Sequence, residues 1–362
     1  MGQRFLLFGS FIASLILFLV NESKTVQVYH CLEVCKDVKC PENCNCTERS
    51  VNCHDRNVTN VPRIPCGIQY LNLSNCSISD LTINEISNLR CSFETLTFMN
   101  LSDCKINLLE EDVFTNLTQL EVVDLSSNKI GENLQSLQRG LGSLSSAPLR
   151  ELNLNHIRIS NGLREIFKYF SGSHLTHLSM RENQIIEFED KALENFTKLL
   201  HLDLHGNWIN KVTLISGIQT LELFNLSHNQ INIFPPVFCD TKTGQTRYNN
   251  LTNLDLSWNQ IILPSSPSWN CLKTLQAFNL SRNDMEDITN NDSFANLTSL
   301  KTLVLSEMRT TLRRIRSEAI KSDSLQHLDL SGNGLNFEVD KEVASDIFNY
   351  LPNLMSLDVS DN

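Results

Sequence analysis

Four cysteines near the N-terminus are spaced so that they could form disulfides or bind zinc. Their spacing is C-x3-C-x-C-x6-C, at Cys40, Cys44, Cys46 and Cys53. Four cysteines allow three disulfide pairings, and four thiolates also form structural zinc sites. Arg4 followed by an apolar run over residues 5–20 is typical of a secretory signal peptide, which we assign to residues 1–23. The secretory pathway is oxidising, so we expect disulfides and no metal site.

The sequence contains no motif that predicts catalysis. A nucleophile elbow, a phosphate-binding glycine loop, a zinc-binding helix motif and paired catalytic carboxylates are not found. We therefore predict a protein that is not an enzyme and has no cofactor. The net charge of −11 argues against a general affinity for nucleic acid or other polyanions.

A repeated frame, L-x-x-L-x-L-x-x-N-x-L, organises the remaining sequence. A clear copy begins at Leu251, and twelve copies in register occupy residues 68–362. This is the leucine-rich repeat signature, which predicts an α/β solenoid shaped like a horseshoe, with a parallel β-sheet on its concave face. The Asn positions of the frame fall at 76, 104, 128, 157, 183, 207, 229, 259, 283, 308, 333 and 362. Residues 26–67, which contain the four cysteines, are expected to cap the first repeat.

The frame gives each position a role. Leucines of the x-L-x-L segment point inward and the residues between them point to the concave face, because side chains alternate along a strand. The Asn side chain is expected to bond backbone groups of the bend that would otherwise be buried unpaired. Ile157 and Met308 occupy two Asn positions, so we expect irregular turns there. Pairs such as Phe114 and Leu117 are expected in the core.

Polar side chains on neighbouring outward positions form a candidate binding surface. His177 and His201 hold equivalent places on adjacent strands and should lie about 5 Å apart. Two interpretations stay open: a pH-sensitive or metal-binding patch, and ordinary solvated sheet surface. The candidate residues are His177, Arg181, His201, Asp203, His205 and Asp255.

Other cysteines can be placed by the same frame. Cys239 and Cys271 follow consecutive Asn positions at similar distances, so adjacent coils should bring them within bridging distance. Cys66 and Cys91 precede the first two strands, and we expect a bridge there as well. We expect buried free thiols at the two Asn positions that hold cysteine, Cys76 and Cys104. Cys31 and Cys35 have no assigned partner, although they could pair with each other.

Thirteen N-x-S/T sequons suit a secreted chain. Four of them arise from the repeat itself and are weaker predictions: Asn72, Asn100, Asn225 and Asn279. We predict glycosylation at Asn45, Asn57, Asn75, Asn116, Asn195, Asn250, Asn291 and Asn296.

The cysteine spacing, followed by Val61-Pro62 and Ile64-Pro65, resembles the N-terminal cap of extracellular leucine-rich repeat proteins. That resemblance implies the bridges Cys40–Cys46 and Cys44–Cys53. Together with the unequal repeats, 22 to 30 residues long, and the F-x-x-L spacing, the chain resembles the N-terminal part of a Toll-like receptor ectodomain. This implies an unidentified microbial or endogenous macromolecular ligand, homo- or heterodimerisation, and innate immune signalling through an intracellular domain.

An alternative is a secreted matrix or adhesion protein that acts as a protein-binding scaffold. The sequence ends inside the twelfth repeat, with neither a C-terminal cysteine cap nor a membrane span. We therefore expect a truncated chain whose membrane attachment, in the receptor interpretation, lies beyond residue 362. Either interpretation places the chain in the secretory pathway, on the extracellular or lumenal side of a cell-surface or endosomal membrane.

Overall fold

The computed structural model describes residues 38–362 with some internal gaps. The gaps are residues 173, 190, 213–216, 240–242, 244, 247, 263–268, 286, 289–292, 310–313, 316 and 336–346. The expected signal peptide, Cys31, Cys35 and Asn291 lie outside the described residues.

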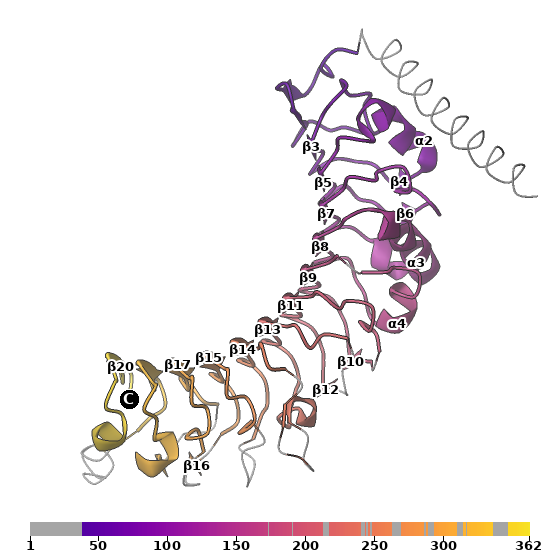
Figure 1. Ribbon diagram of the computed structural model, residues 1–362. Helices are drawn as coiled ribbons and strands as arrows, with labels where there is room; N and C mark the ends of the chain where they lie inside the picture. Colours follow the sequence, from indigo (N-terminus) through magenta and orange to yellow (C-terminus); the bar gives the residue numbers. More distant parts are fainter. Residues whose placement is uncertain are drawn as a thin grey trace, which may run out of the picture.

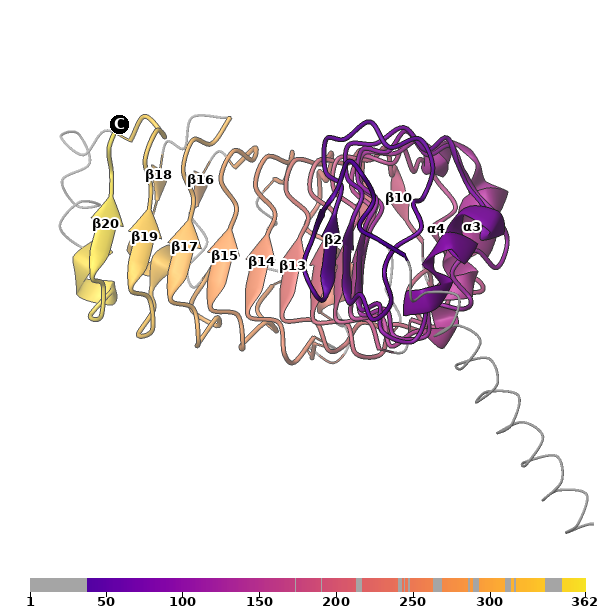
Figure 2. The ribbon, with the colours of Figure 1, turned by 90° about the horizontal axis from the view of Figure 1, so that it is seen from above.

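One long sheet lines the inner side of a curved solenoid, as the sequence predicts (Figure 1). Its fourteen strands follow the order β1-β2-β3-β5-β7-β8-β9-β11-β13-β14-β15-β17-β19-β20. Only β1 and β2 pair antiparallel, as a hairpin in the cap, and every later neighbour is parallel. Figure 2 shows successive strands from β13 to β20 lying side by side.

Each repeat contributes a three-residue strand that begins at the first outward position of the frame. The bounds in the sheet are β1 Asn45–Cys46, β2 Ser50–Asn52, β3 Tyr70–Asn72, β5 Phe98–Asn100, β7 Val122–Asp124, β8 Glu151–Asn153, β9 His177–Ser179, β11 His201–Asp203, β13 Leu223–Asn225, β14 Asn253–Asp255, β15 Ala277–Asn279, β17 Thr302–Val304, β19 His327–Asp329 and β20 Ser356–Asp358. The central residue of nearly every strand is buried, which leaves the flanking residues on the concave face.

The outer side of the arc is built from short elements (Figure 1). Two-residue strands pair there as β4 Asp80–Leu81 with β6 Leu108–Leu109, β10 Glu187–Phe188 with β12 Lys211–Val212, and β16 Asp287–Ile288 with β18 Arg314–Ile315. The α-helices are α2 Ile83–Ile86, α3 Leu134–Gly142 and α4 Leu163–Ile166. The 3₁₀ helices are η1 Ser87–Ser92, η2 Ile130–Glu132, η3 Ser143–Ser146, η4 Pro236–Phe238, η5 Ser317–Ile320 and η6 Ile347–Tyr350. Phe114 and Leu117 are buried, which confirms their predicted place in the core.

A ladder of asparagine side chains joins consecutive coils. The Asn259 amide nitrogen donates to the carbonyl oxygens of Leu226 and Leu256, both at 3.0 Å, and its side-chain oxygen accepts the N–H of Ile231 at 3.0 Å. Leu226 and Ile231 belong to the preceding coil, so each rung reaches backward. Because the rung is buried, these bonds satisfy backbone groups that water does not reach.

The prediction of irregular turns at Ile157 and Met308 is confirmed for the pairing with the preceding coil, where Gly131 donates to Ile157 and Arg309 donates to Asn283, and is wrong for the residue that precedes each position. The residue before each Asn position has a positive φ in all twelve coils, and His156 (53°) and Glu307 (49°) follow the rule. Because rungs reach backward, Asn183 accepts the N–H of Ile157 at 3.1 Å and thereby holds the turn from the next coil.

At position 157, where isoleucine replaces asparagine, the backbone pairing with the preceding coil differs from that in the other coils. There the N–H of Gly131 donates to the Ile157 carbonyl oxygen at 2.9 Å. A Cβ on Gly131 would lie 2.4 Å from that oxygen, so only glycine fits. The long connection that follows is not distorted but forms α3, whose N-cap Asn133 accepts the N–H of Ser136 and whose Leu137 and Leu141 are buried.

Three of the predicted disulfides are confirmed. The cap contains Cys40–Cys46 and Cys44–Cys53, and Cys239–Cys271 joins two consecutive coils with its Cα atoms 5.6 Å apart. A Cys66–Cys91 bridge is not among the disulfides of these described residues, although the Gly67 N–H donates to the Cys91 carbonyl oxygen. Cys91 is disulfide-bonded elsewhere, and a sulfur forms only one such bond, so that prediction is wrong.

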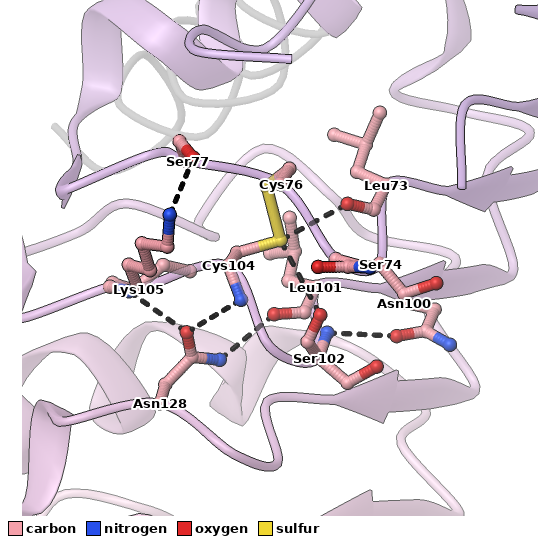
Figure 3. The surroundings of a disulfide bond; sticks show 12 residues. Leu73, Ser74, Cys76, Ser77, Asn100, Leu101, Ser102, Cys104, Lys105 and Asn128 are labelled. Carbon is pink, nitrogen blue, oxygen red and sulfur yellow. Dashed lines mark hydrogen bonds between the residues drawn. A yellow bond between two sulfur atoms is a disulfide. The ribbon is translucent and has the colours of Figure 1, made fainter. Parts of the chain in front are cut away.

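The prediction of free thiols at Cys76 and Cys104 is also wrong, because the two residues form a disulfide (Figure 3). Adjacent Asn positions stack directly, which places these Cα atoms 4.3 Å apart. The Cys104 sulfur lies 3.1 Å from the Leu73 carbonyl oxygen, the place where an asparagine would direct its amide nitrogen. The Cys104 N–H still donates to Asn128, at 3.1 Å, so the ladder continues below the disulfide.

Candidate functional site on the concave face

Asparagine and aspartate at the third residue of most strands have a structural role. In each such strand the side-chain oxygen accepts the backbone N–H two residues later, which closes the turn at the strand end. Asp203 accepts from His205 at 3.0 Å, and Asp255 accepts from Ser257 at 2.8 Å. One oxygen of each of these two candidate residues is therefore engaged by the fold.

The two candidate histidines of the first outward position are in contact. His177 of β9 and His201 of β11 are register partners, and their ring centroids lie 4.1 Å apart in an edge-to-face arrangement. Glu151 of β8 is the next register partner of His177. Burial, and then the neighbouring His177, lower the pKa of His201, whereas Glu222 and Glu151 act in the opposite direction. The predicted adjacency of the pair is confirmed.

Arg181 and His205 lie at the end of the strands, away from that pair in the frame. The Arg181 Nε lies 3.7 Å from the Asp203 carboxylate. His205 places Nδ1 2.8 Å from the Ser227 hydroxyl and Nε2 3.2 Å from Glu182. The six candidate residues thus occupy three rows of the sheet and do not converge on one point.

A hollow of about 390 Å³ lies on the concave face across β11, β13, β14, β15 and β17. Of the candidate residues it includes His201, Asp203 and Asp255. The floor is formed by buried central residues such as Phe224 and Phe278, and small side chains surround it. We call this surface the concave hollow. The remaining lining residues are Leu202, Leu223, Asn225, Asn253, Leu254, Ala277, Asn279, Thr302 and Val304.

A row of stacked side chains that the sequence patterns did not predict follows the strand ends. The His205 and His228 rings lie 4.6 Å apart, His228 stacks on Trp258 at 4.5 Å, and the Arg282 guanidinium lies 4.0 Å from the Trp258 ring centre. Arg282 also pairs with Glu307. We call these four residues the stacked edge. The sequence contains a signal for this row, because His228, Trp258 and Arg282 each immediately precede an Asn position and so share one frame position in consecutive repeats.

Burial is the main cause that lowers the pKa of His228 within the stacked edge, and His205 and Arg282 lower it further. Glu182 and Asp255 raise it. A second aromatic contact that was not predicted lies near the cap, where Tyr70 of β3 and Phe98 of β5 stack with ring centres 4.0 Å apart.

A serine–histidine–carboxylate chain looks like a catalytic triad but is not arranged as one. Ser227 contacts His205, which contacts Glu182. The Ser227 hydroxyl donates its hydrogen to Asn225 at 2.6 Å, so it cannot also donate it to the histidine. Ser227 is buried as well, which keeps it from a substrate.

The sequons divide into two groups by their environment. The predicted sites within the described residues are exposed: Asn45, Asn57, Asn75, Asn116, Asn195, Asn250 and Asn296. The four repeat-derived sites are partly buried on the concave face, and each uses its side-chain oxygen in a strand-end turn. Asn225 and Asn279 line the concave hollow.

No group of three or more histidine, cysteine, aspartate or glutamate side chains converges as a metal site in the part of the chain that the structure describes. Over the same residues, no helix is long and apolar enough to span a membrane.

Comparison with protein families identifies the cap and the repeats. A leucine rich repeat N-terminal domain matches residues 39–65, and the Leucine Rich Repeat matches residues 67–89, 220–241, 250–272 and 324–346. The chain therefore carries a leucine-rich repeat N-terminal cap followed by a leucine-rich repeat solenoid.

Known relatives belong to matrix and receptor proteins. Human lumican is 27% identical over 270 residues, which cover 71% of this chain and 72% of lumican. Chicken (Gallus gallus) keratocan is 28% identical over 61% of this chain and 62% of its own. Human Toll-like receptor 3 is 29% identical over 70% of this chain, but the match spans only 28% of the receptor.

Solved structures share the fold. The match in an octameric complex of Latrophilin 3, Unc5D and FLRT2 has a TM-score of 0.58 and 20% identity, and covers 88% of this chain and 83% of that one. Human 5T4 has a TM-score of 0.54 and 23% identity, with 66% and 87% covered. The TLR13–ssRNA13 complex has a TM-score of 0.54 and 23% identity, with 82% and 40% covered. At these identities the likeness supports the solenoid fold alone.

Proposed function

We propose that this chain is a protein-binding solenoid of the extracellular matrix, a scaffold that holds a macromolecular partner in its concave hollow and catalyses no reaction. The observation that carries the proposal is the hollow itself. On β15 and β17 the first outward side chains, Ala277 and Thr302, are short, so a partner can approach the buried floor there. Lumican and keratocan, which are matrix proteoglycans, support this assignment over a signalling receptor.

The mixed character of the hollow suits a protein surface. Leu223, Ala277 and Val304 offer apolar contacts, while Asp203 and Asp255 each retain a second carboxylate oxygen beyond the one that closes the strand end. Protein interfaces combine an apolar centre with polar groups at the rim. The net charge of −11 favours a partner that is basic where it meets the rim.

The test is binding of the full secreted chain to extracellular matrix laid down by cultured fibroblasts, measured as a saturable titration. Glutamates introduced by Ala277→Glu and Thr302→Glu would fill the hollow and bury unpaired charge, so we expect binding at least about tenfold weaker. Thr115→Glu is the matched control, because Thr115 is exposed and does not line the concave hollow. Equal binding by both variants would overturn the proposal, and so would the lack of any saturable binding.

A Toll-like receptor ectodomain is the second candidate, supported by the 29% identity to Toll-like receptor 3 and by the unequal repeat lengths. In that case the chain binds ligand and dimerises in front of a membrane span and an intracellular signalling domain. Sequencing the transcript beyond the codon for Asn362 separates the candidates. A membrane span with a signalling domain supports the receptor, whereas a cysteine cap followed by a stop codon supports the scaffold.

A further inference from the structure

Large apolar side chains are exposed on one side of four consecutive coils. They lie in the segments that follow the Asn positions 183, 207, 229 and 259, where the chain leaves the concave sheet. The exposed fractions run from 38% for Ile186 and 48% for Trp208 to 62% for Ile262 and 70% for Ile233. We call these four residues the apolar flank. Exposed apolar groups that lie next to one another mark interaction surfaces.

Backbone hydrogen bonds place the four residues of the apolar flank on adjoining coils. The Trp208 N–H donates, at 3.0 Å, to the carbonyl oxygen of the residue just before Ile186. In the same way, the Ile262 N–H donates at 3.4 Å to the residue just before Ile233. The coil of Ile233 is bonded to the coil of Trp208 as well, through the N–H of Gln230. The apolar flank is therefore one continuous row across the solenoid.

Folding does not require apolar side chains at these positions. The buried residue of each segment is the second after the Asn position, which is isoleucine in all four coils. The first residue after the Asn position is tryptophan only at Trp208, and the neighbouring coils have Gln184, Gln230 and Gln260 there. The third residue is isoleucine only at Ile186 and Ile262, and the two coils between them have Asn210 and Asn232.

The stacked edge adds a rigid aromatic side chain at the border of the apolar flank. Trp258 directly precedes the Asn position of the last of these coils, is 37% exposed, and lies between the His228 ring and the Arg282 guanidinium. Tryptophan and arginine are enriched among the residues that contribute most to protein interfaces. Because the Trp258 ring is already held in place, little side-chain entropy is lost when a partner covers it.

The apolar flank carries no unbalanced charge, which indicates what kind of partner it fits. Lys211 and Glu187, register partners on β12 and β10, lie 3.8 Å apart, and Arg282 pairs with Glu307. The polar residues between the apolar ones are uncharged: Asn210, Gln230 and Asn232. Two copies of a chain with a net charge of −11 repel each other, so they can meet most easily where the surface is neutral.

The predicted sugars of these coils leave the apolar flank uncovered. Asn195 and Asn250 are exposed, and they lie in the segments that lead back into β11 and β14. Neither belongs to the segments that follow the Asn positions, so a second copy can approach from that side.

We propose that the apolar flank is the contact surface of a homodimer in which two solenoids lie side by side and antiparallel. A two-fold axis midway between the coils of Trp208 and Ile233 places Trp208 against Ile233 of the second copy. The same axis places Ile186 against Ile262 of the second copy, so each apolar side chain meets another, as in an isologous interface. The concave hollow lies on a different face, and the dimer does not depend on the proposed matrix function.

The experiment is sedimentation velocity of the full secreted chain, with its sugars retained, over a series of micromolar concentrations. We expect a reversible equilibrium between monomer and dimer. Trp208→Gln and Ile262→Asn introduce the residues that neighbouring coils have at the same positions, so the fold should be kept, and each should weaken dimerisation at least about tenfold. Tyr169→Gln is the matched control, because Tyr169 is an exposed aromatic residue outside these segments. Ala277→Glu, in the concave hollow, should dimerise as the wild type does.

Cysteine cross-linking tests the antiparallel arrangement. Ile186→Cys and Ile262→Cys are prepared separately, and disulfide-linked dimers should form when the two variants are mixed under mild oxidation. Neither variant alone should form them, because the axis places residue 186 of one copy against residue 262 of the other. Circular dichroism checks that each variant is folded.

Three results would overturn the proposal. The first is a wild-type chain that stays monomeric at every concentration, which would leave the apolar flank to a different protein. The second is dimerisation of Trp208→Gln as tight as that of the wild type, or an equal loss in Tyr169→Gln. The third is cross-linking of a single cysteine variant that mixing does not increase. Failure of matrix binding would leave these results unaffected, because sedimentation is measured without matrix.

Discussion

Replacing Asn183 by alanine tests whether the asparagine ladder holds the turn at Ile157. The Asn183 side-chain oxygen accepts the N–H groups of Ile157 and Ile159, at 3.1 and 3.0 Å. Its amide nitrogen donates to the carbonyl oxygens of Leu154 and Met180, at 2.9 and 3.0 Å. The amide nitrogen also lies 3.1 Å from the Arg181 carbonyl oxygen, and Asn183→Ala removes all five bonds at once. The Ile157 side chain has no polar atom that could replace them.

The expected cost follows from the groups left unpaired. Ile157 and Ile159 are fully buried, so water cannot reach their N–H groups after the substitution. A buried donor without a partner costs roughly 1–3 kcal/mol. Two such donors, with some relaxation of the turn, predict a loss of about 3–5 kcal/mol in the free energy of unfolding. Gln184→Ala is the matched control, because Gln184 is the next residue and is exposed.

Urea denaturation of the full chain measures the loss, provided that the m-value is unchanged. Coils of a solenoid contact only their neighbours, so hydrogen exchange is the sharper assay. The amides of Ile157 and Ile159 should exchange at least about 100-fold faster in Asn183→Ala, while distant coils change little. If Asn183→Ala stays within about 0.5 kcal/mol of Gln184→Ala, the backward-reaching rung does not hold the turn.

Three further outcomes are expected. Replacing Cys76 and Cys104 by serine removes a cross-link between residues 28 apart and should cost about 3 kcal/mol in urea denaturation, whereas asparagine at both positions should restore part of the loss by rebuilding the ladder. Because burial lowers the pKa of His201, the unfolded chain binds its proton more readily, so stability should fall as pH drops below about 6.5, and His201→Gln should flatten that part of the profile. Glycopeptide mapping should find sugar on the exposed Asn195 but none on Asn279, whose amide nitrogen donates to Asp255 at 3.3 Å; a sugar on Asn279 would contradict its assigned place in the concave hollow.

The sequence predicts the sheet well because the position of a residue in the repeat frame determines its place on the sheet. Two residues at the same frame position in consecutive repeats lie side by side on neighbouring strands, whatever the lengths of the connections between them. That rule alone places His177 beside His201 and brings Cys239 near Cys271, and the structure confirms both.

The predictions fail where they depend on residue type instead of frame position. Cys76 and Cys104 share the Asn position in consecutive coils, so the same rule predicts contact, whereas the burial of cysteine as a residue type suggests a free thiol. The stacked edge has the same explanation, since His228 and Trp258 share one frame position. The prediction of a Cys66–Cys91 bridge fails for another reason. Closeness of two cysteines in the frame does not determine which sulfur Cys91 bonds.

The direction of the ladder could not be obtained from the frame. An Asn at each bend predicts that the bend is bonded, but not that its partners belong to the preceding coil. Only the structure shows that Asn183 serves the turn at Ile157, so that a missing asparagine leaves its own turn intact.

At positions where the repeat uses the same residue type, a different residue points to a possible binding role. The residue two places before the Asn position is serine in the repeats of β3, β5 and β7, and again from β13 to β20. Several of these serines donate to the strand-end Asn or Asp, as Ser257 does to Asp255. The exceptions are Asn155, Arg181 and His205, in the consecutive repeats of β8, β9 and β11. Asn155 has a structural role, because its side-chain oxygen accepts the N–H of Arg181 at 2.6 Å and thereby closes the end of β9, where Ser179 replaces the usual Asn or Asp. The side chains of Arg181 and His205 take no part in a strand-end turn, and the same two strands carry His177 and His201 at the first outward position. The departures at Arg181 and His205 make β9 and β11, next to the concave hollow, a segment of the concave face to probe for binding.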